Sequence, residues 1–269
     1  MNSNTESNLV RYDKIGIGYD STRRADRYLS QKMFDFIHSG REQSLYVDVG
    51  CGTGNYTSAL YEMGLNFVGI DPSDEMLNKA QQKNNEITWK KGTAENIELP
   101  SESIDGALVS LTMHHWNDLN TGFKEIQRVM KKEAKVVIFT STPEQTKSFW
   151  LNHYFPQMIE DSCDILPRMD NIEKAFKAAD MEIIKLEPYF IKPDLEDWFL
   201  YCGKHDPKMY FNEEIRRGIS SFSLIALQNE ISNGLQKMKV DVESGEINNV
   251  IKKHENDIGD YLFIVGHKK

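Results

Sequence analysis

The chain has few cysteines: Cys51, Cys163 and Cys202 are the only three among its 269 residues. They are an odd number, lie far apart and show no C-x-x-C spacing, so we expect free thiols rather than a disulfide framework or a metal site. No apolar run approaches the roughly 18 residues that cross a bilayer, and the start, MNSNTESNLV, lacks the basic and apolar regions of a signal peptide. We therefore expect a cytoplasmic protein without a membrane partner.

Basic residues are also scarce relative to acidic ones. The chain has 32 Lys and Arg against 41 Asp and Glu, a formal net charge of −9. Binding to nucleic acid without sequence preference depends on Lys and Arg that neutralise phosphates, so a nucleic-acid partner is disfavoured. With 39% hydrophobic and 27% charged residues, the chain has the composition of a soluble globular protein: one α/β domain with an elaboration.

A glycine-rich stretch, residues 45–54 (LYVDVGCGTG), dominates the first half of the chain. Its apolar residues suit a parallel strand covered on both faces, and the strand passes through Asp48 into three alternate glycines, Gly50, Gly52 and Gly54. A strand, a glycine turn and a helix start form the ligand crevice of an open α/β sheet. The dinucleotide fingerprint G-x-G-x-x-G is not met, because Asn55 takes its last position. A dinucleotide oxidoreductase is therefore a weaker alternative.

A second apolar strand follows at residues 66–71 and ends in Asp71. An acid about twenty residues beyond such glycines, at the end of the second strand, can hydrogen-bond a ribose hydroxyl. Together, the glycine turn and Asp71 indicate a ligand that contains a nucleoside.

Four sequence blocks resemble the class I methyltransferases that use S-adenosylmethionine, in particular the small-molecule, methyltransferase type 11-like group. They are VDVGCGTG (47–54), GIDPSDEML (69–77) and GTAENIELPSESIDGALVSLTMHHW (92–116), the last of which holds two motifs. The resemblance covers roughly residues 40–140. It implies an α/β, Rossmann-like fold: a seven-stranded, mostly parallel sheet with helices on both faces, an antiparallel last strand and a helical lid.

The same resemblance implies a set of cofactor-binding residues. Asp71 would hold the ribose hydroxyls, and Leu111 would present a backbone carbonyl to the amine. Thr93 stands where many relatives have an acid, so a contact to the adenine amino group would come from Thr93, Glu95 or the backbone. Tyr19-Asp-Ser-Thr-Arg23 resembles an element in which Arg23 could bind the methionyl carboxylate. The remaining members are Tyr12, Tyr19, Asp48, Gly50, Cys51, Gly52, Gly54, Pro72, Met76 and Ala94.

The candidate catalytic residues are His114, His115 and Tyr19. The two histidines follow an apolar stretch at residues 104–111 that we expect to be the fourth strand, and histidine is a natural general base near neutral pH. The alternative is that they pack or shape the pocket without transferring a proton. Because the methyl donor is already activated as a sulfonium, alignment for in-line displacement can supply most of the acceleration.

We expect a single methyltransferase domain over residues 1–269. Residues 1–40 would form an N-terminal helical lid, and residues 143–170 and 188–257 would form helical cap insertions. Helical patterns cover residues 195–202 and 213–238, the latter as two helices or one kinked helix. The aromatic residues at 148–156 suit an acceptor wall or a packing element equally well, and Arg216 and Arg217 suit an exposed surface better than an anionic acceptor.

The sequence thus predicts an enzyme that transfers a methyl group from S-adenosylmethionine to oxygen, nitrogen or carbon of a small-molecule metabolite. The alternatives are an RNA methyltransferase, which the acidic balance disfavours, and a non-catalytic protein that binds S-adenosylmethionine. The acceptor, the use of a base and the oligomeric state, monomer or homodimer, stay open.

Overall fold

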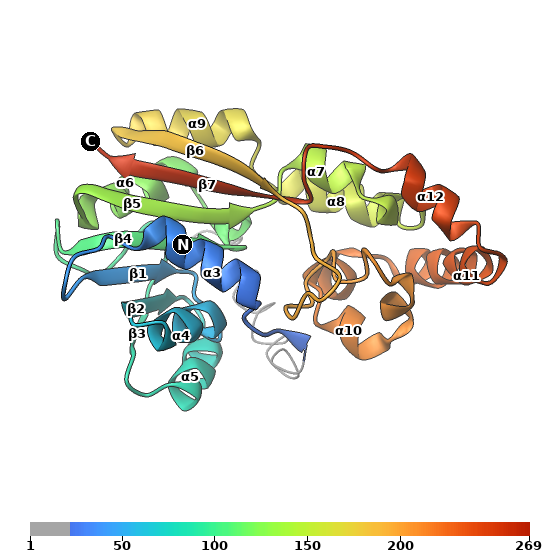
Figure 1. The fold of residues 1–269 in the computed structure, drawn as a ribbon, viewed down its shortest axis with the longest axis horizontal. Helices are drawn as coiled ribbons and strands as arrows, with labels where there is room; N and C mark the ends of the chain where they lie inside the picture. The colour runs from blue at the N-terminus through green and yellow to red at the C-terminus, as the bar shows by residue number, and fades with distance from the viewer. Residues whose placement is uncertain (1–21) are drawn as a thin grey trace.

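The computed structural model describes residues 22–269, and a seven-stranded β-sheet forms the centre of this part (Figure 1). The strand order is β3-β2-β1-β4-β5-β7-β6; β7 runs antiparallel to β5 and β6, and the other paired strands are parallel. This topology confirms the predicted fold class. The strands are β1 Leu45–Val49, β2 Asn66–Asp71, β3 Thr88–Lys91, β4 Ile104–Ser110, β5 Met130–Thr140, β6 Met181–Tyr189 and β7 Tyr261–Lys268.

Helices cover both faces of the sheet because side chains of the central strands alternate between two cores. In β1, Tyr46 joins the core under α3 (Arg27–Ile37) and α4 (Asn55–Glu62). Val47 and Val49 join the core under α6 (Leu119–Val129) and α9 (Met169–Ala178). The helix α5 (Asp74–Lys83) packs beside β2 and β3.

The helix α3 is the part of the expected N-terminal lid that the structure describes best. Asp26 caps it by accepting hydrogen bonds from the backbone N–H groups of Tyr28 and Leu29. Its buried residues Leu29, Met33 and Ile37 are spaced four apart and pack on the sheet at β4 and β5. The other residues of interest in this region, Tyr12 and Tyr19, lie outside the described residues.

The remaining helices form a cap beyond the carboxyl ends of the parallel strands, at the right of Figure 1. Three short segments of the cap form two 3₁₀ turns (Trp150–His153 and Pro207–Phe211) and a π turn (Ser221–Ile225). The aromatic residues at 149–155 lie in the cap's core: Phe149, Trp150, Tyr154 and Phe155 are all buried. The cap helices are α7 Pro143–Ser148, α8 Pro156–Ile165, α10 Glu213–Arg217, α11 Gln228–Ser244 and α12 Ile247–Lys253.

One expectation for the cap was wrong and another was confirmed. Residues 195–202 form turns and bends rather than a helix. From 195 to 201 the buried side chains are those of every second residue, Leu195, Asp197, Phe199 and Tyr201, which is not a helical period, and Cys202 is buried as well. The pattern at 213–238 forms two helices, α10 and α11, with the π turn between them, and α11 continues to Ser244. Packing against the rest of the molecule therefore decided residues 195–202, and helical propensity did not.

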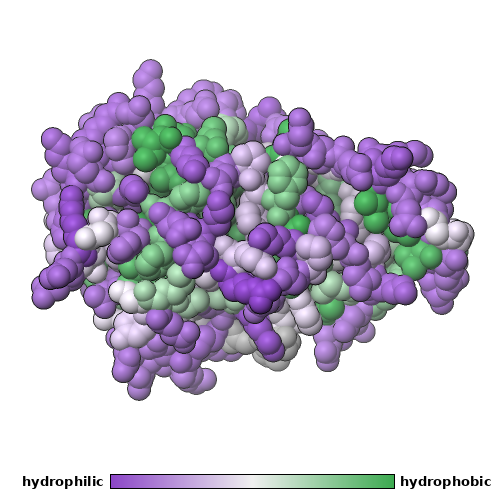
Figure 2. Space-filling view, in the orientation of Figure 1, coloured by the Kyte–Doolittle hydropathy of each residue, from purple (hydrophilic) through white to green (hydrophobic). Residues whose placement is uncertain are grey.

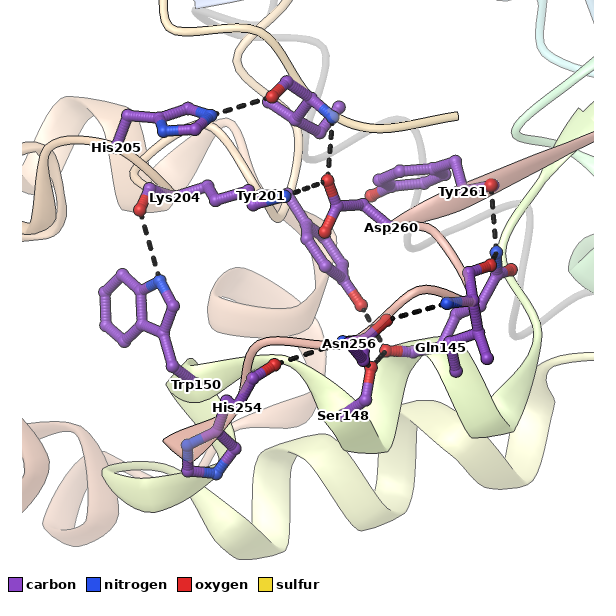
Figure 3. A network of polar contacts seen from close by, with 12 residues as sticks. Gln145, Ser148, Trp150, Tyr201, Lys204, His205, His254, Asn256, Asp260 and Tyr261 are labelled. Atoms are coloured by element: carbon purple, nitrogen blue, oxygen red, sulfur yellow. Dashed lines mark hydrogen bonds and ion pairs between the residues drawn. The ribbon is translucent and has the colours of Figure 1, made fainter. Parts of the chain in front are cut away.

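A polar network attaches the cap to the end of the sheet (Figure 3). The Asp260 carboxylate, directly before β7, accepts from the Ile191 backbone N–H at 2.7 Å and from Lys204 Nζ at 2.5 Å. Gln145 of α7 donates to the Tyr261 carbonyl at 2.9 Å, and the Tyr201 hydroxyl donates to the Gln145 carbonyl at 2.9 Å. These bonds fix the linker after β6 and the start of α7 against the same strand.

The face of the molecule drawn in Figure 2 is mostly hydrophilic, with hydrophobic residues at the surface over the sheet and near α11 and α12. Among the helices of residues 22–269, none combines the length and the apolar composition that a membrane crossing requires.

Candidate active site

A cavity of about 280 Å³ lies between the carboxyl ends of the parallel strands and the cap. On the sheet side, it brings together most of the residues that the sequence predicted: Arg23, Asp48, Gly50, Cys51, Gly52, Asp71, Pro72, Met76, Thr93, Ala94, Glu95, Leu111, His114 and His115. Apart from Arg23, which precedes α3, these residues lie at or shortly after the ends of β1, β2, β3 and β4, which meet at one edge because the four strands are parallel.

The three predicted glycines have different surroundings. Gly50 has φ +78°, and a Cβ there would lie 2.1 Å from Thr112 Oγ1. Gly52 has φ +54° and lines the cavity, and a Cβ added there would have no other atom within 4 Å. Gly54 is the N-cap residue of α4 and is not among the cavity residues; a Cβ there would lie 2.4 Å from the Trp89 ring. Gly54 is thus needed for packing, whereas Gly52 leaves room for a ligand.

Two buried carboxylates lie under the glycine loop. Asp48 Oδ2 accepts from Thr57 Oγ1 at 2.6 Å, whereas Asp48 Oδ1 is buried without a hydrogen-bond partner among residues 22–269. Burial raises the pKa of Asp48 to about 7, and the nearby Asp71 charge adds to the rise. Asp71 accepts from the backbone N–H of Gly52 and of Ser73, each at 2.9 Å, and its pKa is also raised by burial.

Cys51 lies in the same loop but is not a reactive thiolate. Burial, reinforced by the Asp71 and Asp48 charges, raises the pKa of its thiol well above the usual range. Its Sγ is 3.7 Å from the Gly52 carbonyl oxygen. Cys51 is therefore a small packing residue within the loop.

The end of β4 carries backbone strain at the cavity. Leu111 has φ +52°, a left-handed conformation that costs a non-glycine residue on the order of 1–3 kcal/mol. Its N–H donates to the Phe139 carbonyl at 2.8 Å, which ties the strained residue to β5. Beside it, Ser110 Oγ is buried without a partner in the described part of the chain. Strain and an unsatisfied hydroxyl at one strand end are typical of a ligand site.

The two histidines follow in a short 3₁₀ turn, Met113–His115, with ring centroids 3.8 Å apart. Burial lowers the pKa of His114 to about 4, and burial together with the neighbouring ring lowers the pKa of His115 well below the usual value. Both imidazoles are therefore neutral at pH 7. A group with a pKa of about 4 is a weak proton acceptor at that pH, so the lowered pKa values favour hydrogen bonding by neutral imidazoles over general base catalysis.

The expected adenine end of the cavity is lined by Met76, Thr93, Ala94 and Glu95. Met76 and Ala94 are buried. Glu95 Oε1 accepts from the backbone N–H of Asn117 at 2.6 Å and thereby holds the segment after the histidines. Trp116 and Asn117 also line the cavity here, although sequence reasoning did not select them.

The cap side of the cavity is where sequence reasoning missed most residues. The hydroxyls form pairs: Ser141 Oγ is 2.6 Å from Thr146 Oγ1, and Ser162 Oγ donates to Ser221 Oγ at 3.1 Å. Only Thr140 carried a usable signal, because it ends the fifth strand and strand ends face the crevice. The missed residues include Thr140, Ser141, Thr146, Ser162, Ile165, Leu166, Asp197, Phe199, Leu200, Ile219, Ser220, Ser221, Ile225 and Tyr261.

The aromatic residues at 149–155 and the two arginines of the cap do not contribute to this wall. The cavity lining among the described residues does not include Trp150, Tyr154 or Phe155. Arg216 donates to the Tyr210 carbonyl at 2.6 Å, and Arg217 pairs with Glu213 on the surface at 2.5 Å. The aromatic residues are thus a packing element, and neither arginine reaches the acceptor side.

Comparisons with known proteins point to one family. Residues 47–138 match the family described as "Methyltransferase domain". The biotin biosynthesis bifunctional protein BioHC of Cellvibrio japonicus is 26% identical over 133 residues, which cover 49% of this chain and 26% of that protein. The uncharacterized methyltransferase Rv3342 of Mycobacterium tuberculosis is 33% identical over 99 residues, 37% of this chain and 40% of that protein. The matches thus span well under half the length of these curated relatives.

A solved structure is similar over nearly the whole length. The putative methyltransferase from an antibiotic biosynthesis pathway of Anabaena variabilis is 30% identical, with a TM-score of 0.81, and the match covers 92% of this chain and 99% of that one. With the sheet order, the glycine loop and the cavity at the strand ends, this similarity shows that the chain belongs to the class I S-adenosylmethionine-dependent methyltransferase family.

Proposed function

We propose that the chain transfers the methyl group of S-adenosylmethionine to a small-molecule metabolite. One observation carries this proposal: a single cavity has the glycine loop and two buried carboxylates on one side and the cap on the other. A cofactor and an acceptor can therefore lie next to each other in a space that the cap screens from water. The cofactor supplies a methyl group that is already activated as a sulfonium.

The sheet side of the cavity fits S-adenosylmethionine. Asp48 Oδ1, buried without a partner among residues 22–269, would accept from the ammonium of the methionine part. Gly52 would allow close approach, and the Asp71 carboxylate would receive the ribose hydroxyls. Met76, Thr93, Ala94, Glu95 and Pro72 would surround the adenosine, Gly50 and Cys51 would shape the loop, and Leu111 would offer its carbonyl.

Of the three N-terminal candidates, the structure describes only Arg23. Arg23 lines the cavity and would receive the methionyl carboxylate. Tyr12 and Tyr19, as lining or catalytic groups, remain predictions because they lie outside the described residues.

The acceptor would occupy the cap side of the cavity. Its wall combines apolar side chains, such as Ile165, Leu166 and Ile219, with the paired hydroxyls of serine and threonine. This wall suits a mostly apolar molecule with oxygen-containing groups, because hydroxyls both donate and accept hydrogen bonds. The similar Anabaena protein is described as a putative methyltransferase from an antibiotic biosynthesis pathway, and a secondary metabolite of that kind is the acceptor that we propose here.

His114 and His115 would orient the acceptor. Their lowered pKa values keep both rings neutral, so each can hydrogen-bond an acceptor hydroxyl or amine beside the methyl group. In-line alignment is then the main contribution of the protein to the rate.

The first test of the proposal is calorimetry with S-adenosylhomocysteine, with a nicotinamide dinucleotide as the comparison ligand. We expect micromolar or tighter binding of S-adenosylhomocysteine and no binding of the nicotinamide dinucleotide. Turnover of labelled S-adenosylmethionine in a metabolite extract then separates an enzyme from a non-catalytic binder. Salt-sensitive binding of tRNA would instead support the RNA methyltransferase alternative. Dinucleotide binding alone would overturn the proposed function.

We also expect cofactor binding to release protons from Asp48. At pH 6.5, a carboxyl with a pKa of about 7 is mostly protonated. Pairing with the ligand ammonium favours the ionised form and lowers that pKa, so binding should release roughly half a proton or more. Calorimetry at pH 6.5 in phosphate and in bis-Tris, two buffers with different ionisation enthalpies, measures this release as the dependence of the binding enthalpy on the buffer.

The matched variant for this prediction is Asp48→Asn. It cannot ionise, but its amide oxygen can still accept from Thr57. We expect it to bind S-adenosylhomocysteine more weakly and to release no proton. Binding enthalpies of the unsubstituted protein that are identical in the two buffers would contradict the assigned role of Asp48.

A further inference from the structure

We propose that Asp197, oriented by the Tyr56 hydroxyl, is a positioning residue that holds the Arg23 guanidinium where it can receive the carboxylate of the cofactor's methionine part. This inference rests on the proposed function. It assigns a role to a cap residue that carries no sequence motif and lies 174 positions from Arg23 in the chain.

The Arg23 side chain is held by a two-point contact. Arg23 Nε donates to Asp197 Oδ1 at 2.5 Å, and a terminal nitrogen of the guanidinium donates to Asp197 Oδ2 at 3.2 Å. Such a bidentate ion pair fixes the plane of the guanidinium as well as its position. It matters here because residues 23–26 form neither helix nor strand, so hydrogen bonds of regular secondary structure do not position this side chain.

Asp197 is itself fixed to the glycine loop through Tyr56. The Tyr56 hydroxyl donates to Asp197 Oδ2 at 3.0 Å, and Tyr56 lies in the first turn of α4, directly after that loop. Burial and the Asp197 charge raise the pKa of Tyr56 well above the usual range, so its hydroxyl stays a donor. Through Asp197 and Tyr56, the Arg23 guanidinium is therefore held in a fixed position relative to the start of α4, where the ligand's methionine part would lie.

Backbone contacts join the same segments. The Trp198 N–H donates to the Thr22 carbonyl at 3.1 Å, and the Glu196 N–H donates to Asp26 Oδ2 at 3.1 Å. Asn55, the first residue of α4, donates from its side chain to the Arg23 carbonyl at 3.1 Å. The cap linker, the chain before α3 and the start of α4 thus converge at one place.

A purely structural ion pair would not need to be in this place. Taking two charges out of water costs about as much as their attraction returns, so a buried pair is a weak device for stability. The same two segments already carry an exposed pair, Arg27 with Asp194, which is outside the cavity. In contrast, Arg23, Tyr56 and Asp197 all line the cavity, and the Asp197 side chain is only 2% exposed. This location in the cavity wall favours a role in ligand binding over a purely structural one.

The test compares two ligands that differ at the methionine part. S-adenosylhomocysteine carries the carboxylate, and 5′-methylthioadenosine has the same adenosine and thioether without it. For Asp197→Asn, we expect the Kd of S-adenosylhomocysteine to rise about tenfold, the size of one charge-assisted contact, and the Kd of 5′-methylthioadenosine to change less than about twofold. Tyr56→Phe should give a smaller change of the same kind, about threefold.

The matched control is Asp194→Asn, which removes an exposed carboxylate from the same linker and should leave both affinities unchanged. Equal losses for the two ligands, or no loss for S-adenosylhomocysteine, would overturn the positioning role. If Asp197→Asn does not fold, Tyr56→Phe decides alone, and unchanged S-adenosylhomocysteine affinity overturns the inference. An unsubstituted protein that binds neither ligand would instead refute the proposed function.

Discussion

Asp71→Ala is expected to weaken S-adenosylhomocysteine binding by about 1–3 kcal/mol, the usual effect of losing hydrogen bonds to a charged group. The carboxylate would bind the ribose hydroxyls, and it also accepts from the N–H groups of Gly52 and Ser73. Its removal therefore takes away a ligand contact and loosens the loop that faces the cavity. Calorimetry of the variant measures the sum of the two effects.

The loop effect can be measured separately by chemical denaturation of the ligand-free protein, because the ribose contact does not exist there. The control is Asp74→Ala, three residues further on, where the carboxylate is exposed and pairs with Lys91 on the surface. We expect this control to leave affinity and stability unchanged. Unchanged affinity in Asp71→Ala would remove Asp71 from the proposed ribose site.

Gly50→Ala is expected to lower both stability and cofactor affinity. At φ +78°, an alanine costs about 1–2 kcal/mol. Its Cβ would also lie 2.1 Å from Thr112 Oγ1 and 2.7 Å from Thr112 Cβ, an overlap that typically costs a further 1–3 kcal/mol or so. Relief of this overlap would push the loop and the end of β4 apart, at the strand end that leads to both histidines. Urea denaturation measures the first effect and calorimetry the second.

Gly40→Ala is the matched control because Gly40 has a similar φ of +70° and open space where a Cβ would stand. It should show only the backbone cost. In addition, Thr112→Gly in the Gly50→Ala protein should recover part of the loss, since it removes the overlapping atoms. If Gly50→Ala costs no more than Gly40→Ala, the close approach of Thr112 is not what restricts this position.

Local sequence patterns were sufficient for the parallel half of the sheet. The second strand was expected at residues 66–71 and is β2, Asn66–Asp71. Ser73 is of a residue type that favours the N-cap position, and its side chain does accept from the Met76 N–H at the start of α5. The apolar run of β5 covers residues 136–139, but the strand begins at Met130, which pairs with Ile104. That extension depends on a neighbouring strand, so the local pattern did not predict it.

The cap shows where local patterns failed. Residues 195–202 have a helix-compatible composition, yet every second side chain is buried, and one of these is the carboxylate of Asp197. A charged residue in that position is tolerated because Arg23 and Tyr56, from distant parts of the chain, supply its hydrogen bonds. Helical periodicity carries no information about such partners.

The amino-acid sequence alone was therefore enough for the fold class, through the family resemblance of its four blocks. It was also enough for the sheet side of the cavity, because strand, turn and helix signals there are local and parallel strands gather their ends at one edge. Gly50, Gly52, Asp48 and Asp71 follow from that rule. The tertiary structure decided the acceptor wall, the lowered pKa values of the histidines and the contact of Asp197 with Arg23. Each of these three features depends on burial and on residues far apart in the chain. No local sequence pattern predicts them for that reason.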